Sequence, residues 1–406
     1  MKKRFSMLFL LCLTLIVCGL FTNSRVFANE SIKSINDLPQ TDLPQTDLIK
    51  INNSIDKVLS SDFEIMKTWK FTSCKDVIKD PKLLQLIDKS NKFNVEWYKK
   101  GDLKINNYTS KLNIVDLIKE SNNKYIANVT HDVKFKVIGN DFLSESTGKR
   151  YRIELMCENN KWYITKLLDL ATDLDTDNVN PIENEKNSIT RSSRSLNKNN
   201  QFPNYDNMIN SKILSISEAS NNIDEYAEKL KVNLSSNSNE MPISRAYSGY
   251  NSSGAVAYAH KWATSFNPKY MRFSADCTNF VSQCAFEGGR IPNHNISPVW
   301  IPALQEKGAP KYSKSWTCVK DFYNFMLQAG YASAPEGGCK QARLGDVLQL
   351  YNVPKNDWTH AMIVTKIDSK GRVYYSAHTD PKLDVPVWYA LDGKTYGNIR
   401  LIKFWH

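Results

Sequence analysis

Cys277 stands where the sequence predicts the start of a buried helix. The segment 274–283 opens with polar residues, and apolar or small residues follow the cysteine at helical spacing, namely Phe280, Val281, Cys284 and Ala285. A thiol at a helix N-terminus lies at the positive end of the helix dipole, which favours the nucleophilic thiolate. Free backbone N–H groups there can also hold an oxyanion. A core cysteine that merely begins a buried stripe has the same spacing, so catalysis requires a partner.

His360 is the candidate base for that thiol. It lies at the beginning of a predicted strand, residues 358–365, and a turn at 368–371 returns the chain along a second strand that ends near His378. Pairing across this hairpin would bring His378 close to His360. A nucleophile, a base and a third group that orients the base form the triad pattern of covalent catalysis. Without such partners, His360 could be a structural histidine.

Several choices at this site stay open. Asp380 or Asp384 could orient His360 in place of His378, and no oxyanion donor is assigned. The cysteines that follow residue 28 include no CxxC pair, so their spacing predicts no metal site; they are Cys74, Cys157, Cys277, Cys284, Cys318 and Cys339. The expected mechanism requires no metal and no cofactor.

The segment 52–175 is predicted to form a separate α+β domain. Helical spacing at 55–66 and 83–98 comes before four alternating strands, at 125–129, 133–137, 151–155 and 162–165. Alternation of this kind predicts an antiparallel sheet with one solvated face. By analogy, this order of elements is that of a cystatin-like or NTF-like domain. We find no catalytic set in it and expect a spacer, regulatory or docking module.

The remaining boundaries follow from composition. Residues 1–28 have a basic head, an apolar run and Val26-Phe27-Ala28, which is the layout of a cleaved signal peptide and predicts secretion. No integral membrane segment is expected after its removal. Residues 29–51 carry the short repeat DLPQTDLPQTDL, and residues 176–244 are polar with one helix near 205–234, so both are predicted to be linkers. Residues 245–406 then form the domain that holds Cys277 and His360.

Positive charge is concentrated in the C-terminal part. The whole chain carries +11, and residues 241–406 hold 19 Lys or Arg against 11 Asp or Glu. Such a field attracts anionic polymers, which for a secreted protein means cell-wall polymers rather than nucleic acid. The same charge can also serve solubility alone.

Residues 245–406 resemble a known family, the putative amidase domain of secreted Gram-positive proteins, through the motifs DCTNFVSQ, GDVLQ and WTHAMIVT. That family is similar to papain-like wall hydrolases of the CHAP and NlpC types, in which a helix packs on an antiparallel sheet. The resemblance implies Cys277 as nucleophile, His360 as base and His378 as third polar residue. It also implies that Asp276 contacts a substrate amine, for which helix capping is the alternative role.

We therefore expect a secreted or cell-wall-associated cysteine amidase or peptidase from a Gram-positive bacterium. Its expected substrate is an amide bond in peptidoglycan, and its expected partner is peptidoglycan or another anionic wall polymer. An inactive papain-like binding module and a protein-directed cysteine protease or acyltransferase are the alternatives. Which amide bond is cleaved and the oligomeric state are left open.

Overall fold

The computed structural model describes residues 42–174, 201–232, 249–306 and 311–405. The predicted signal peptide, residues 1–28, lies outside the described residues, as does much of the predicted linker sequence. The end of the predicted linker 29–51 is helical from Gln45 onward, because Leu48 and Ile51 are buried. Within the described ranges, no helix is long and apolar enough to cross a membrane.

Residues 42–174, called here the N-terminal unit, consist of helices followed by an antiparallel meander. The helices are α2 (Gln45–Leu59), α3 (Ser61–Thr68) and α4 (Pro81–Lys100). The strands are β1 (Ile105–Ser121), β2 (Lys124–Val137), β3 (Ser144–Glu158) and β4 (Lys161–Asp169). α4 begins where Asp80 caps the Leu83 N–H at 2.7 Å and Pro81 takes the first turn. The two short strands predicted at 125–129 and 133–137 are one strand, β2, because the alternation continues through buried His131.

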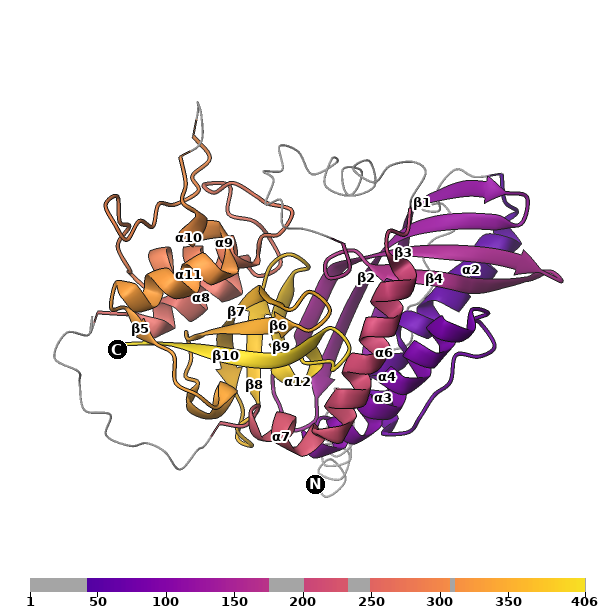
Figure 1. Ribbon diagram of the computed structural model, residues 1–406, viewed down its shortest axis with the longest axis horizontal. Helices are drawn as coiled ribbons and strands as arrows, with labels where there is room; N and C mark the ends of the chain where they lie inside the picture. The colour runs from indigo at the N-terminus through magenta and orange to yellow at the C-terminus, as the bar shows by residue number, and fades with distance from the viewer. Residues whose placement is uncertain (1–41, 175–200, 233–248, 307–310, 406) are drawn as a thin grey trace, which may run out of the picture.

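Two further helices precede the C-terminal unit. The single helix predicted near 205–234 is divided into α6 (Tyr205–Asn221) and α7 (Ile223–Glu228). α6 runs alongside α4 on the N-terminal unit (Figure 1).

Residues 249–405, called here the C-terminal unit, combine helices with a second group of strands. The helical elements are α8 (Ser252–Trp262), α9 (Cys277–Gln283), the π-helical turn η2 (Cys284–Gly288), α10 (Lys314–Thr317), α11 (Val319–Gln328), the 3₁₀ turn η3 (Gly338–Gln341) and α12 (Val387–Ala390). The strands are β5 (Ala332–Ser333), β6 (Val347–Asn352), β7 (Asp357–Ile367), β8 (Val373–Ala377), β9 (Lys382–Pro386) and β10 (Tyr396–Phe404). The predicted mixture of helices and antiparallel strands, an α+β class, is confirmed.

One sheet connects the two units. Its strand order is β1-β2-β3-β9-β8-β7-β6-β10-β5, with β4 on the other part of β3, and neighbouring strands are antiparallel. The junction is short: Glu145 pairs with Leu383 and Ser146 with Lys382. The N-terminal unit is therefore joined to the C-terminal unit by main-chain pairing.

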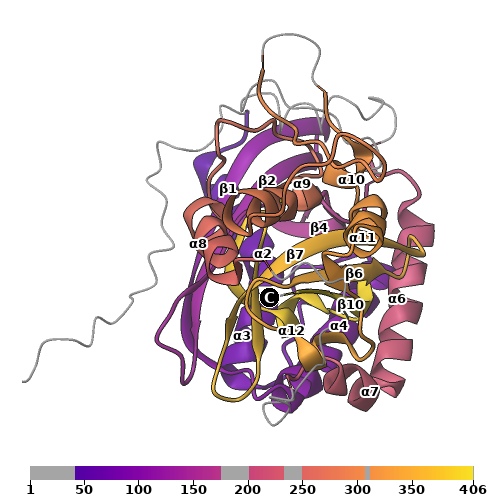
Figure 2. The ribbon, with the colours of Figure 1, turned by 90° about the vertical axis from the view of Figure 1, so that its left-hand side faces the viewer.

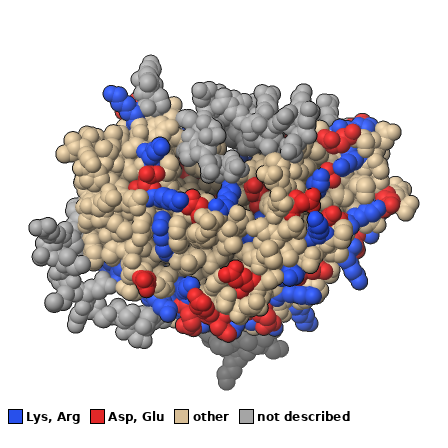
Figure 3. All heavy atoms as spheres, viewed as in Figure 1, with Lys and Arg blue, Asp and Glu red and all other residues tan. Residues whose placement is uncertain are grey.

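Two cores lie on opposite faces of β7. Ala361 and Ile363 pack toward α8, α9 and α11, whereas Met362 and Val364 belong to the core shared with the N-terminal unit. Alternate residues of a strand face opposite sides, which explains this division. Figures 1 and 2 show the C-terminal strands between these helices and the N-terminal unit. On the face shown in Figure 3, basic and acidic side chains are interleaved.

Candidate active site

Cys277 is the first residue of α9 and packs against the backbone of β7. Its side chain is buried, and Sγ lies 4.0 Å from the carbonyl oxygen of Thr359 and 3.8 Å from the Thr278 hydroxyl. The pairing of β7 with β8 begins at Ile363, which pairs with Ser376. The β7 backbone before Ile363 is therefore not paired with β8. The sulfur therefore lies beside the main chain on both sides of His360.

The protonation of Cys277 differs from the sequence-based expectation. Burial raises the pKa of the thiol, and this effect outweighs hydrogen bonds from the Ala361 N–H and from the hydroxyls of Thr278 and Thr379, which lower the pKa. The predicted resting thiolate at the helix N-terminus is therefore wrong, because desolvation dominates. Cys277 rests as a neutral thiol that has charge-stabilising groups in contact with it.

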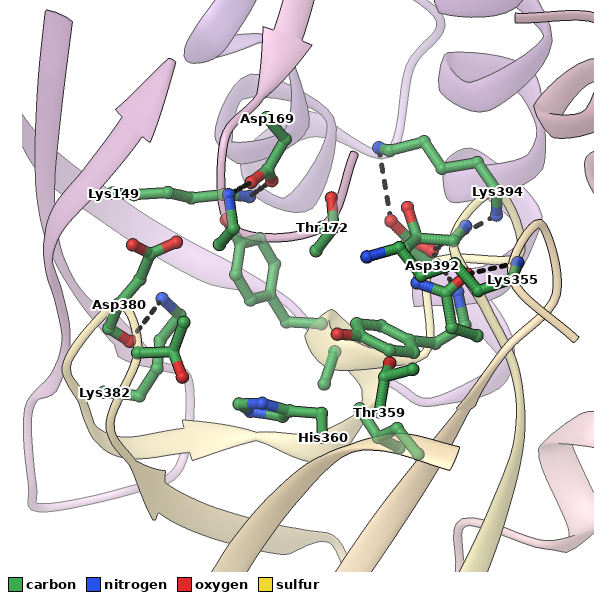
Figure 4. A pocket seen from close by; sticks show the side chains of 18 of the residues that line it. Lys149, Asp169, Thr172, Lys355, Thr359, His360, Asp380, Lys382, Asp392 and Lys394 are labelled. Carbon is green, nitrogen blue, oxygen red and sulfur yellow. Dashed lines mark hydrogen bonds and ion pairs between the residues drawn. The ribbon is translucent and has the colours of Figure 1, made fainter. Parts of the chain in front are cut away.

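His360 opens into a cavity on the other side of β7 from the α9 core. It lines a space of about 910 Å³, counted with its opening to solvent, together with Thr359, Thr379 and Tyr396 (Figure 4). Burial, and then the charge of Lys382, lower the pKa of His360 to about 4. The ring is therefore neutral near pH 7, the state in which an imidazole accepts a proton.

Cys277 does not itself line this cavity, but two of its neighbours do. Thr359 and Thr379 both line the cavity, and both contact the sulfur. In the described part of the chain, no direct hydrogen bond joins Cys277 to His360. Catalytic hydrogen bonds in structures without substrate are often long and tighten in the complex.

His378 makes other contacts than those the sequence suggested. Its Nδ1 lies 2.7 Å from Asp276 Oδ2, its Nε2 lies 2.9 Å from the Trp262 carbonyl oxygen, and its ring stacks on Phe280. Both ring nitrogens therefore lie beside oxygen atoms that can accept a hydrogen bond. Among the described residues His378 makes no hydrogen bond to His360, and its role as the third catalytic group stays a prediction without a contact to support it.

Asp276 is equally occupied. Besides His378, its carboxylate accepts hydrogen bonds from the Phe273 N–H at 3.0 Å and from the Asn279 amide at 2.9 Å. It does not cap α9 with its side chain, and the residue is 2% exposed. The carboxylate therefore joins the loop before α9 to His378, and it presents no open surface to a substrate amine.

The two acidic alternatives differ in position. Asp384 accepts from His260 Nε2 at 2.9 Å and is thereby directed toward α8. Asp380 lines the cavity with His360, and its Oδ1 lies 3.6 Å from Arg150 Nε. Of the three candidates for a third group, Asp380 is the one that shares the His360 cavity.

Thr379 is a site residue that sequence reasoning missed. Its φ is +83°, a conformation that costs a β-branched residue about 1–3 kcal/mol. Its hydroxyl accepts from the Asp276 N–H at 3.2 Å and contacts the Cys277 sulfur. The surrounding structure therefore holds a strained residue against Cys277. No sequence signal marks it, apart from its place after His378.

The N-terminal unit contributes the opposite wall of the cavity. Lys149, Asp169 and Thr172 line the same space as His360 (Figure 4). Sequence analysis assigned no site residue to this unit, because the wall forms only when the two units pack together. No group of His, Cys, Asp and Glu that could hold a metal ion is found in the described ranges.

Comparison with known proteins gives a partial relationship. Residues 249–401 match a family model described as "Putative amidase domain". Two Bacillus subtilis (strain 168) proteins, both described as uncharacterized, are similar to part of the chain. YjcM is 30% identical over 39% of this chain and 39% of its own length, and YhbB is 29% identical over 32% and 42%. The chain thus spans about two fifths of these relatives. No solved structure matches significantly, so papain-like and cystatin-like descriptions remain analogies.

Proposed function

We propose that this protein hydrolyses an amide bond with Cys277 as nucleophile and His360 as base. The amidase-domain match covers both residues and supports amide hydrolysis. The observation that supports the proposal is the place of the sulfur: it lies against the carbonyl of Thr359, a residue that lines the cavity into which His360 opens. Cys277 itself is buried and does not line the cavity, so the reaction requires that the sulfur become accessible to a substrate carbonyl past Thr359 and Thr379.

The reaction starts from a neutral pair. His360 accepts the thiol proton as sulfur attacks the carbonyl carbon, and the imidazolium then protonates the leaving amine. A water molecule, deprotonated by His360, hydrolyses the thioester and releases the acid and the thiol. The Ala361 N–H and the Thr379 hydroxyl stabilise negative charge on sulfur, since they already contact it. Because no direct hydrogen bond joins the pair at rest, a side-chain rotation or one bridging water must complete the proton path.

We extend the proposal to the substrate and the location of the protein on the basis of charge and the N-terminal sequence. The basic C-terminal half and the predicted signal peptide fit a secreted or wall-associated enzyme that acts on peptidoglycan. Asp380 is the preferred group to orient His360, because it lines the same cavity.

A non-catalytic binding module is the second candidate. The raised pKa of Cys277 and the lack of a Cys277–His360 hydrogen bond in the described residues favour it. Such a module would retain wall binding without releasing fragments.

The test is mass spectrometry of fragments released from purified Gram-positive peptidoglycan. Wild type and the control Cys318→Ala should release fragments with new amine and carboxyl ends, whereas Cys277→Ala should release none. Equal release by Cys277→Ala refutes the mechanism. Wall binding by all three proteins without any release identifies the binding module.

A further inference from the structure

Lys382 places a buried ammonium group in the His360 cavity. The residue is the first of β9, is 8% exposed and lines the cavity. Its Nζ donates to the Asp380 carbonyl oxygen at 3.1 Å. Within the described residues, no carboxylate lies within ion-pairing distance of this ammonium. Burial lowers the pKa of Lys382 to about 8, and the more distant charges of Asp380 and Asp169 offset only part of that effect. A closer anion would compensate this buried charge further.

Several other charges of the cavity wall have ion-pair partners, whereas Lys355, which also lines the cavity, donates to the Leu174 carbonyl oxygen at 2.8 Å. Lys149 lies 3.1 Å from Asp169, Lys394 lies 3.7 Å from Asp392, and Arg150 lies 3.6 Å from Asp380. Asp169 and Asp392 therefore each have a cation in ion-pairing distance, whereas the Asp380 carboxylate is influenced by both Lys382 and Arg150. Among the described residues, Lys382 and Lys355 both line the cavity without an ion pair to a carboxylate, and Lys382 is the one whose charge acts on His360, so an anionic group is favoured beside His360.

Lys382 also lies near the proposed base. Its charge contributes to the lowered pKa of His360, and Figure 4 shows both side chains at the same end of the cavity. A group bound to Lys382 would therefore lie close to the reacting amide.

The N-terminal unit fixes this lysine. Lys382 pairs with Ser146 of β3, and Lys149 and Arg150 of the same strand take the neighbouring carboxylates. Residues 146–150 lie outside the part of the chain that matches the amidase family. The N-terminal unit thus shapes the cavity, although sequence reasoning gave it no site residue.

We infer that Lys382 binds a carboxylate of the substrate, so that the preferred substrate is a peptide-type amide with a free carboxylate near the scissile bond. This inference rests on the proposed function for the position of that bond. Charge-assisted hydrogen bonds to an ammonium are the strong ones in proteins, and we expect about 10-fold or more in affinity from this contact.

The binding test does not depend on turnover. The full chain with Cys277→Ala is titrated with the dipeptide acetyl-Ala-Ala and with its carboxamide, and the His360 ring protons are followed by NMR, assigned by comparison with His360→Gln. The acid should bind about 10-fold more tightly than the carboxamide and should shift the His360 signals. Added Lys382→Met should remove the difference, whereas Lys382→Arg should keep most of it.

Two controls separate this contact from general charge and from misfolding. Lys366→Met removes a half-exposed lysine that already lies 3.8 Å from Asp384, and it should leave the difference unchanged. The rescue by Lys382→Arg excludes a folding defect. Equal binding of acid and carboxamide, a difference that survives Lys382→Met, or no saturable binding of either probe overturns the inference. Failure of wall hydrolysis with a preserved acid preference would instead refute only the proposed function.

Discussion

The resting state of Cys277 gives the sharpest prediction. Burial raises the pKa of the thiol above its ordinary value, and the pKa of His360 is lowered to about 4, so the two groups do not form an ion pair near neutral pH. A thiol with a pKa above ~8.5 is less than ~3% thiolate at pH 7. Alkylation of Cys277 by iodoacetamide should therefore rise about 10-fold per pH unit between about pH 6 and 8.

The assay measures the rate at Cys277 separately from the other cysteines. Protein sampled over time is digested, and the alkylated fraction of the Cys277 peptide is quantified by mass spectrometry, with the Cys318 peptide as internal reference. His360→Gln should leave the pH dependence unchanged, because the imidazole carries no charge in this range. The conclusion depends only on how steeply the alkylation rate rises with pH. Slow access of the reagent to the buried thiol lowers the rate at every pH and does not affect this slope.

A flat rate between about pH 5 and 8 would refute the reasoning. It would mean that thiolate already exists at rest and that the helix N-terminus outweighs burial. If His360→Gln then removed the flat rate, an imidazolium–thiolate pair would be the cause. No alkylation at any pH would refute the accessibility that the proposed function requires.

Three further predictions concern catalysis and stability. His360→Gln should lower kcat for wall hydrolysis by about 10²–10⁴-fold, and an unchanged kcat would exclude His360 as base. Trp388→Ala should lower the free energy of unfolding in urea by about 3–5 kcal/mol, because Trp388 is fully buried and its ring centroid lies 4.5 Å from that of Trp97. The control is Leu214→Ala: Leu214 is 70% exposed, so its replacement should change the free energy of unfolding by less than about 0.5 kcal/mol. If Trp388→Ala lowered the free energy of unfolding no more than Leu214→Ala does, this result would contradict a core shared by the two units. Burial lowers the pKa of His131 from 6.5 to about 4, so the unfolded chain binds the proton first and the free energy of unfolding should fall as pH decreases from 6.5 to 4. His131→Gln should flatten that slope, and an equal slope in both proteins would refute the assignment.

Local pattern in the sequence was sufficient for the secondary structure around the site. Cys277 begins a helix and His360 lies in a strand, because helical spacing and alternation record which side of each element is buried. The order of helices followed by antiparallel strands in the N-terminal unit could be read in the same way, although two of the predicted strands are the single strand β2 and β1 was not predicted. These features depend on residues only a few positions apart.

The contacts of His378 depended on register. Extending the observed pairing of Ile363 with Ser376 places His378 opposite Ala361, on the face of α8 and α9, and places His360 on the other face. The sequence-based pairing set His378 beside His360. Because side chains alternate along a strand, a shift of one residue moves a group to the opposite face.

The sequence by itself determined which residues could act as nucleophile and base, and on which elements they lie. Tertiary structure decided their protonation, because desolvation by distant segments sets the pKa of Cys277 and His360. It also decided that β3 pairs with β9, which brings an N-terminal wall and its charges to the cavity that Lys382 lines. The physical reason is that local periodicity reports burial, whereas long-range packing determines which charges meet.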